Sequence, residues 1–256
     1  MLTLPLIAWP AALAIGLSLG LLGSGGSILT IPVLIYLCGL SEKMAIASAL
    51  IIVACISFVG AMPYIRAQKV QWKVVFGFGM PGMFGTYLGA YASHWISGTI
   101  QLVLFAIVMI SAAFFMIRRP APHSTAPLQW YRLLGGGFLV GIVTGLVGVG
   151  GGFLIVPALL LLARIEMTQA VASSLVIICS NALIGFFKYF QLLHNQGLHF
   201  NWPLIVLVSV LGIVGSWIGS KWAIKLPQTL LRRIFAIMLV LMGGYILYHS
   251  ANAYAH

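Results

Sequence analysis

Acidic side chains are nearly missing from this chain of 256 residues, because Glu42 and Glu166 stand alone against 13 Lys and Arg. Charged residues make up 6% of the sequence and hydrophobic residues 62%, whereas soluble domains are typically about 25% charged and 45–50% apolar. A soluble protein of this size could not cover its apolar core with so few charges. The sequence therefore predicts a polytopic membrane protein that has the lipid bilayer as its solvent.

The same scarcity limits the chemistry that the chain can perform. Both carboxylates are expected at helix ends, and no nucleophile, base and orienting residue occur together. We therefore expect no enzyme, no catalytic residue, no cofactor and no metal site. Cys38, Cys55 and Cys179 form no CxxC motif and lie in apolar runs, so we interpret them as buried hydrophobic residues rather than disulfide partners.

The net charge of +11 would suggest a nucleic-acid partner in a soluble protein. Here the cations lie in short loops, where retention on the cytoplasmic side of a membrane explains them, so no nucleic-acid partner is expected. The first 42 residues contain no Lys or Arg. They lack the basic leader of a signal peptide, and we expect the first segment to belong to the mature fold.

Glycine, by contrast, is abundant, with 29 residues, and its spacing reveals an internal repeat. A shift of 125 residues aligns Gly16–Ala61 with Gly141–Phe186 without a gap, and 16 of those 46 positions are identical. Beyond Ala61 the register slips by five residues, after which pairs such as Trp72/Trp202 still match. A period this long indicates a duplicated domain rather than a solenoid.

The repeat predicts two halves, residues 1–117 and 133–256, joined by a polar, proline-broken cytoplasmic linker at residues 118–132. Each half should contain a helix hairpin with a glycine-rich tip, re-entrant or crossing, followed by three transmembrane helices separated by loops such as Pro63–Lys73 and Lys188–Trp202. The apolar segments are Leu2–Leu22, Ile28–Leu40, Met44–Met62, Val74–Ile96 and Thr99–Ile117, then Leu133–Val147, Phe153–Ala163, Gln169–Phe187, Pro203–Trp222 and Thr229–Tyr248.

Charge distribution favours an inverted arrangement of these halves. If each hairpin returns to the face from which it entered, the halves are inverted, and 11 cations fall on one face with Lys43 and Lys188 on the other. If each hairpin counts as one broken crossing, the halves are parallel and the cations divide seven against six. The positive-inside rule favours the first arrangement. We therefore expect an all-α membrane protein of two inverted repeats with both termini outside.

Two glycine-rich breaks, at residues 23–27 and 148–152, each precede a short helix that contains a proline. Non-helical backbone in a membrane must be buried in protein or line a water-filled cavity, and matching breaks in two halves point to a binding site between the repeats. The helix after each break would direct free N–H groups and a positive dipole end toward the break, which suits an anion. The predicted substrate-binding residues are Gly23, Ser24, Gly25, Gly26, Ser27, Thr30, Ser48, Gly148, Gly150, Gly151, Gly152, Ser173, Ser174 and Asn181.

Glycine also has an alternative role here, which is to let helices pack closely. This interpretation is favoured for the four pairs at a spacing of four residues, Gly16/Gly20, Gly141/Gly145, Gly85/Gly89 and Gly215/Gly219.

The motifs GLLGSGGSILTIPVLIYL and GLVGVGGGFLIVPALLLL, each followed by Ala-Ser near the start of the next helix (Ala47-Ser48 and Ala172-Ser173), resemble the sulfite exporter TauE/SafE family, also called the 4-toluene sulfonate uptake permease family. The resemblance covers nearly the whole chain. It implies transport of small sulfur oxyanions or organosulfonates, often outward, across the bacterial cytoplasmic membrane. The expected partners are thus a small anionic substrate and membrane lipid, with the oligomeric state left open.

Three functions remain open from the sequence. The first is a secondary transporter that works by alternating access, with the anion bound between the two breaks. The resemblance implies that it is an exporter. The second is an anion channel, which would share the chemistry of the breaks but need a continuous pore. The third is a membrane scaffold or assembly protein, in which the breaks would be structural.

Overall fold

The chain is helical throughout the part that the computed structural model describes, which is residues 8–23, 25–118, 129–147, 152–194 and 200–254. No strand occurs in these ranges, which confirms the all-α fold class. The elements of the first half are α1 (Ala8–Leu22), α2 (Gly25–Pro32), η1 (Val33–Leu37), α3 (Glu42–Arg66), α4 (Trp72–Ala92), η2 (Ser93–Trp95) and α5 (Gly98–Arg118). The second half contains α6 (Trp130–Val147), α7 (Gly152–Leu162), α8 (Met167–His194), α9 (Trp202–Ala223) and α10 (Gln228–Tyr254).

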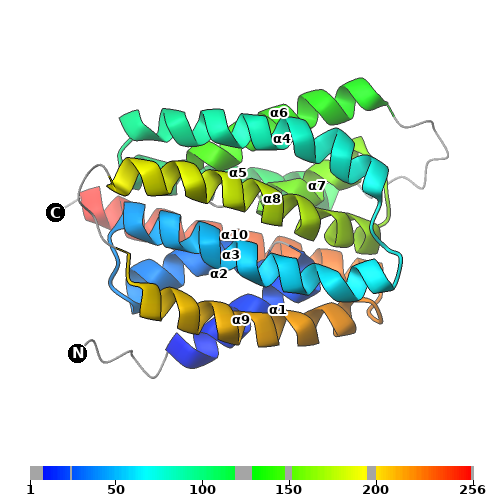
Figure 1. Cartoon of the computed structure of the whole chain (residues 1–256), viewed down its shortest axis with the longest axis horizontal. Coiled ribbons are helices and arrows are strands. Elements are labelled where there is room, and N and C mark those ends of the chain that lie inside the picture. Colours follow the sequence, from blue (N-terminus) through cyan, green and yellow to red (C-terminus); the bar gives the residue numbers. More distant parts are fainter. Residues whose placement is uncertain (1–7, 24, 119–128, 148–151, 195–199, 255–256) are drawn as a thin grey trace.

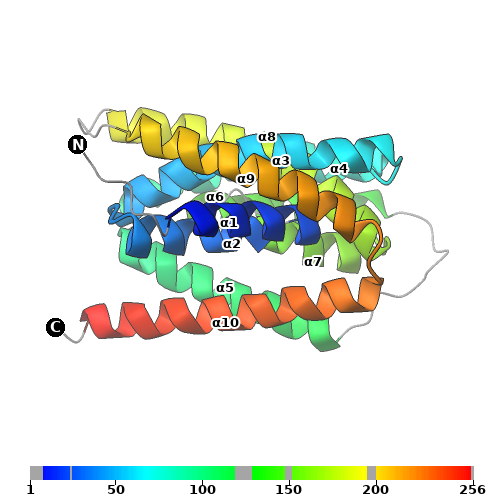
Figure 2. The same ribbon diagram turned by 90° about the horizontal axis from the view of Figure 1, so that it is seen from below.

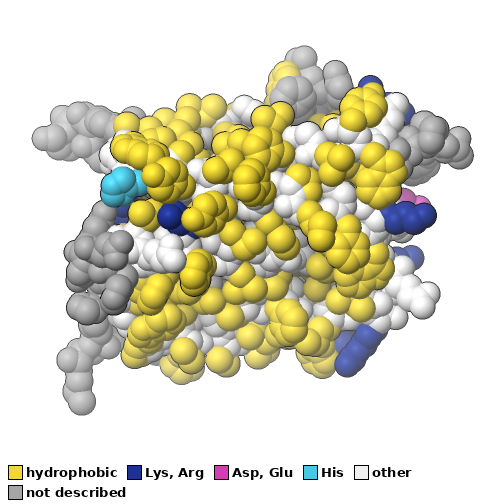
Figure 3. All heavy atoms as spheres, turned by 45° about the horizontal axis from the view of Figure 1, so that its top comes forward, with side chains coloured by type: hydrophobic (Ala, Val, Ile, Leu, Met, Phe, Trp, Pro, Cys, Tyr) yellow, Lys and Arg dark blue, Asp and Glu magenta, His cyan; other side chains and the backbone are white. Residues whose placement is uncertain are grey.

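Helix length and surface composition confirm a polytopic membrane protein. Among the described residues, α3, α6, α8, α9 and α10 are long and apolar enough to cross a bilayer. Apolar side chains cover much of the face seen in Figure 3, and Met80 and Phe84 of α4 are each 62% exposed. In water such a surface would be an aggregation hazard, whereas lipid solvates it. Trp72 and Trp202, the first residues of α4 and α9, are half exposed in the manner of interfacial anchors.

The helices form three layers (Figure 2). Helices α3, α4, α8 and α9 form one layer, and α5 and α10 lie side by side as another. The hairpins α1–α2 and α6–α7 lie between these layers, so lipid reaches their short helices least. This sandwich protects the glycine-rich breaks, as the polar backbone at a break requires.

Packing joins each hairpin to the opposite half. Helix α1 packs along α9, and α6 packs along α4. Each half is therefore completed by the other, as expected for a duplicated domain. Figure 1 also shows that corresponding helices run in opposite directions: α3 runs from left to right and α8 from right to left, and α4 and α9 are likewise opposed.

Close approach of glycine backbones explains the packing of α1 and α6. A Cβ on Gly16 would collide with the carbonyl of Gly212, and one on Gly141 would collide with that of Gly82. Gly85 and Gly215 face their partner helices in the same way. These contacts confirm the packing role predicted for the glycine pairs, in which small residues let two membrane helices approach.

Several predicted boundaries were wrong, because helices continue beyond them. The predicted loop Pro63–Lys73 is shorter, since α3 continues through Pro63 to Arg66, and the loop predicted from Lys188 begins only after α8 ends at His194. Helix α6 starts at Trp130, inside the predicted 118–132 linker, and its 18 residues make it long enough to span. In α3, Pro63 lies in the last turn, where it removes one backbone hydrogen bond but the helix still continues to Arg66.

Proline has a visible effect on the first short helix. Pro32 is the last residue of α2 and cannot donate a backbone hydrogen bond. The chain then widens into the π-helical turn η1, in which the Cys38 N–H donates to the Val33 carbonyl over 3.1 Å. Gly39 follows in the left-handed region with φ of 67°. The predicted Ile28–Leu40 segment is thus not one continuous α-helix, because α2 is followed by a π-helical turn.

Candidate transport site between the repeats

The first break reverses the chain at Gly23, whose φ of 71° lies in the left-handed region that glycine adopts without strain. Helix α1 ends one residue earlier, and α2 begins at Gly25. A Cβ on Gly23 would lie 2.7 Å from the Ser174 hydroxyl and 2.9 Å from the Cα of Val171. The first break is therefore packed against α8 of the other half.

Side chains of α3 and α8 satisfy the carbonyls at the end of α1. The Tyr64 hydroxyl, fully buried, donates to the Gly20 carbonyl over 2.9 Å. The Ser174 hydroxyl lies 2.8 Å from the Val171 carbonyl and 3.3 Å from that of Gly23. The last carbonyls of a helix have no partner within it. Tyr64 and Ser174 supply that partner here, and Ser174 thereby contacts Gly23 of the first break.

The second break has an equivalent arrangement and one additional residue. The Tyr189 hydroxyl lies 3.4 Å from the Gly145 carbonyl and 3.3 Å from that of Leu146. Gln101 of α5 donates its side-chain N–H to the Leu146 carbonyl over 2.9 Å and to the Tyr189 oxygen over 3.1 Å. The carbonyl oxygen of the Gln101 side chain is buried without a hydrogen-bond partner among the described residues. A tyrosine hydroxyl therefore contacts the last carbonyls of both α1 and α6, whereas a glutamine contacts only those of α6 among the described residues.

Sequence analysis missed Tyr64, Tyr189 and Gln101. The signal for the tyrosines was present, because Tyr64 and Tyr189 are separated by the repeat distance of 125 residues. Tyr64 lies just beyond Ala61 and Tyr189 just beyond Phe186, where the alignment was taken to slip. The five additional residues belong farther on, between Tyr189 and Trp202. Gln101 carried no such signal, because its repeat equivalent is Leu231.

The two breaks lie at different depths. Ser174 touches the first and Tyr189 adjoins the second, and these residues are 15 positions apart on α8. At 1.5 Å per residue the separation is about 22 Å along the helix axis. The ends of α1 and α6, which precede the two breaks, therefore lie at different levels along α8.

The first break lies near the end of the molecule that carries most Lys and Arg. The Lys69 N–H donates to the Tyr64 carbonyl, and the Gln71 N–H donates to the Ser173 hydroxyl, both over 3.0 Å. The α3–α4 and α9–α10 connections lie at this same end in Figure 1, and most of the Lys and Arg visible in Figure 3 gather there. Ser173 therefore lies beside the α3–α4 connection, which carries Lys69.

The other predicted residues have different places: some begin the helices after the breaks, and others are buried in helix packing. Gly25 and Gly152 begin α2 and α7, Ser27 and Ser48 are buried, and the Thr30 hydroxyl donates to the Gly26 carbonyl of its own helix over 2.7 Å. Gly26 faces α1, where a Cβ would collide with the Ile15 carbonyl and with Leu19. Ser24, Gly148, Gly150 and Gly151 lie outside the described residues.

Asn181 lies on α8 between Ser174, which contacts Gly23, and Tyr189, which contacts the end of α6. It lies 7 residues from Ser174 and 8 from Tyr189 on α8, roughly 10 and 12 Å along the axis. The side chain is fully buried, and neither its amide nitrogen nor its oxygen has a hydrogen-bond partner among the residues that the structure describes. A Cβ on Gly82 of α4 would lie 3.2 Å from that nitrogen. Buried polar groups are nearly always paired. The Ser57 and Ser209 hydroxyls and the Gln101 side-chain oxygen also lack a partner among the described residues, but only Asn181 leaves both a nitrogen and an oxygen unpaired.

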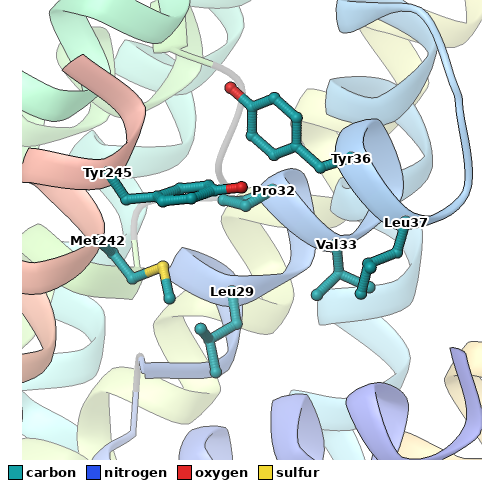
Figure 4. Close-up of a pocket in the computed structure, with 7 residues that line it drawn as sticks. All are labelled: Leu29, Pro32, Val33, Tyr36, Leu37, Met242 and Tyr245. Carbon is teal, nitrogen blue, oxygen red and sulfur yellow. The ribbon is translucent and has the colours of Figure 1, made fainter. Parts of the chain in front are cut away.

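Two apolar cavities flank the hairpins but lack the chemistry of an anion site. One of about 210 Å³ lies between α2–η1 and α10, lined by Leu29, Pro32 and Met242, with the Tyr36 and Tyr245 rings edge to face at 5.4 Å (Figure 4). The other, of about 240 Å³, lies at the repeat-equivalent place between α7 and α5. An anion in either cavity would lose its hydration and gain few hydrogen bonds.

Comparison with known proteins identifies the class to which this doubled hairpin architecture belongs. Residues 8–246 match the family described as Sulfite exporter TauE/SafE. The chain belongs to this family. It is 31% identical to a probable membrane transporter protein of Xylella fastidiosa strain Temecula1 over 245 residues, which cover 92% of each chain. It is also 27% identical to the probable membrane transporter protein YunE of Bacillus subtilis, over 90% of this chain and 92% of YunE.

A third relative, the probable membrane transporter protein MJ0441 of Methanocaldococcus jannaschii, is 25% identical over 94% of this chain and 96% of its own length. No solved structure matches the chain significantly. TauE/SafE membership and these relatives identify a multi-pass membrane transporter, a class defined by transport rather than by catalysis.

Proposed function

We propose that the protein is a secondary transporter that exports a small sulfur-containing anion, of the sulfite or organosulfonate class, from the cytoplasm. The anion passes from the first break past Asn181 to the second break by alternating access of the two halves. The observation that carries this proposal is Asn181 itself, an unpaired buried amide halfway between the two breaks of a TauE/SafE protein. A ligand oxygen would give its N–H groups the partner they lack.

Charge and dipoles support the entry of an anion at the first break. Helix α2 begins at Gly25, so its free N–H groups and positive dipole end face the first break. The loop that carries Lys69 lies above it. Positive charges at the mouth of a low-dielectric path raise the local concentration of anions and their rate of entry.

Orientation follows if the cation-rich end is cytoplasmic, according to the positive-inside rule. The halves are then inverted repeats in a bacterial cytoplasmic membrane, the 118–132 segment lies on the cytoplasmic side, and both termini are outside. A membrane potential of 100 mV, negative inside, favours expulsion of each negative charge by about 2.3 kcal/mol. The potential alone could therefore drive export.

A carrier fits the burial of Asn181 better than a channel does. A channel needs a continuous aqueous pore, whereas Asn181, halfway along the path, is fully buried. Its neighbour Gly82 holds α4 against it. Access to Asn181 therefore requires α4, α6 and α8 to separate, which is the motion of a carrier.

Counterflow in proteoliposomes tests the proposal. Vesicles loaded with unlabelled sulfite should accumulate labelled sulfite in a saturable manner, and the same assay is repeated with organosulfonates. Protein-free vesicles and vesicles that contain an unrelated carrier are the controls. If no small sulfur anion moves under imposed potentials of either sign, the proposal is wrong. Single-channel currents in a planar bilayer would show a channel instead.

A further inference from the structure

The two halves differ most in polarity where a substrate would pass between the breaks. Asn181 lies against Gly82. The repeat-equivalent pair is Ile56 against Gly212, with the Ile56 side chain in the place of the amide. The duplicated fold thus provides two matching positions, of which one is polar.

Asn181 presents both kinds of hydrogen-bonding group. Its amide nitrogen can donate two hydrogen bonds and its oxygen can accept. Since neither atom has a partner, the pairing is incomplete whichever way the amide is turned. A fully deprotonated oxyanion could satisfy the nitrogen but would leave the oxygen facing negative charge. A ligand that satisfies both atoms must itself carry a donor as well as acceptors.

The buried core adds a limit on charge. Its buried polar side chains are Ser, Thr, Gln, Asn and Tyr, and no Lys, Arg or His is buried in the part of the chain that the structure describes. The cost of moving an ion out of water rises with the square of its charge, so a dianion costs about four times as much as a monoanion. No buried cation among the described residues offsets this cost, so the core favours a monoanion over a dianion.

We infer that the transported species is a singly protonated oxyanion, such as hydrogen sulfite, and that Asn181 selects it by accepting a hydrogen bond from its hydroxyl group while donating to its other oxygens. This inference rests on the proposed function and narrows its substrate class. It excludes as good substrates the fully deprotonated dianion and alkyl sulfonates, whose sulfonate group has no proton to donate at neutral pH. The unpaired side-chain oxygen of Gln101, beside the second break, offers a further acceptor on the same path.

Substitution of Asn181 by leucine separates a role in binding from a role in folding. Leucine has a similar size, and the equivalent residue in the other half is already apolar. Because the Asn181 side chain makes no hydrogen bond to any residue that the structure describes, Asn181→Leu should unfold at the same temperature as wild type or higher. Ile56→Leu is the matched control at the equivalent position, and it should leave transport unchanged.

Counterflow of sulfite and of methanesulfonate, with equal pH on both sides of the vesicle, tests the inference. Sulfite transport by wild type should rise as pH falls, in step with the protonated fraction. Methanesulfonate should move at a rate that does not change with pH, on the order of tenfold below the rate of sulfite when sulfite is mostly singly protonated. Asn181→Leu should lower sulfite transport by a factor on the order of ten and remove most of the preference over methanesulfonate. Ile56→Leu should keep both.

Two results would overturn the inference while the proposed function survives. One is equal transport of sulfite and methanesulfonate by wild type with no dependence on the protonated fraction. The other is a folded Asn181→Leu protein that transports sulfite at the wild-type rate, which would mean that Asn181 holds a water molecule at most. If wild type moves no sulfur anion at any pH, the proposed function itself fails.

Discussion

Glycines that look alike in the sequence have different tasks at the first break. Gly23 supplies a left-handed turn with φ of 71°. Gly26 supplies close packing, because its missing Cβ leaves room for the Ile15 carbonyl and Leu19 of α1. The pattern of glycines therefore predicted where the chain breaks. It could not assign a task to each glycine, because the contacts come from tertiary packing.

Replacement of Gly26 by alanine should destabilise the protein rather than only block transport. The added Cβ would overlap backbone of α1, which cannot move away cheaply, so we expect a loss of roughly 1–3 kcal/mol. Gly244→Ala in α10 is the control, since a Cβ there meets nothing within 4 Å and alanine favours a helix by about 1 kcal/mol. Thermal unfolding in detergent checks both. Equal melting temperatures for Gly26→Ala and wild type would contradict the contact.

At the scale of helices, the sequence predicted the order of elements and the two hairpins but not their depths. Hydrophobic runs and glycine breaks are local signals, so they were readable. Helix ends depend on the environment, and for this reason α3 continues past Pro63 and α8 past Lys188. The depth of each break follows from contacts between halves, such as Ser174 with Gly23. The position of each break along the neighbouring helices, and the lack of a hydrogen-bond partner for Asn181 among the described residues, therefore became visible only in the folded chain.

Tyr64 and Tyr189 hold the ends of α1 and α6, and their loss should have unequal effects. Tyr64→Phe leaves the Gly20 carbonyl without its hydroxyl partner in a buried place, which costs about 1–3 kcal/mol. Tyr189→Phe is milder, because Gln101 still donates to the Leu146 carbonyl. Melting temperatures of the two variants in the same detergent test this order. A larger loss for Tyr189→Phe would show that Gln101 depends on Tyr189 for its position.

For the whole molecule, the duplicated fold places similar parts at opposite ends and distributes charge unequally between them. Each hairpin packs on the other half, so neither half has a complete set of neighbours alone. The first break lies toward the end with the Lys69 loop. Toward the opposite end, Lys188 of α8 lies over the Tyr87 and Tyr91 rings at 5.2 and 4.9 Å. The two ends of the molecule thus differ in positive charge, with more cations at the end toward which the first break lies.

The orientation of this asymmetry in the membrane can be measured without knowledge of the substrate. In a variant with Cys38, Cys55 and Cys179 replaced by alanine, single cysteines are placed at the exposed positions Gln68, Lys225 and Ser97. An impermeant maleimide should label Ser97→Cys in intact cells, because the α4–α5 connection lies at the end opposite to the other two (Figure 1). Gln68→Cys and Lys225→Cys should react only after the cells are permeabilised.

Gln68 lies in the connection after α3 and Lys225 in the connection after α9, which is the repeat equivalent of the α4–α5 connection with Ser97. Inverted halves place Gln68 and Lys225 on one side of the membrane, and parallel halves place them on opposite sides. Labelling of these two cysteines from opposite sides would rule out the inverted arrangement. Labelling of both from outside, with Ser97→Cys protected, would keep the inverted halves but reverse the protein in the membrane. The cation-rich end would then face outward and would concentrate anions outside the cell rather than in the cytoplasm.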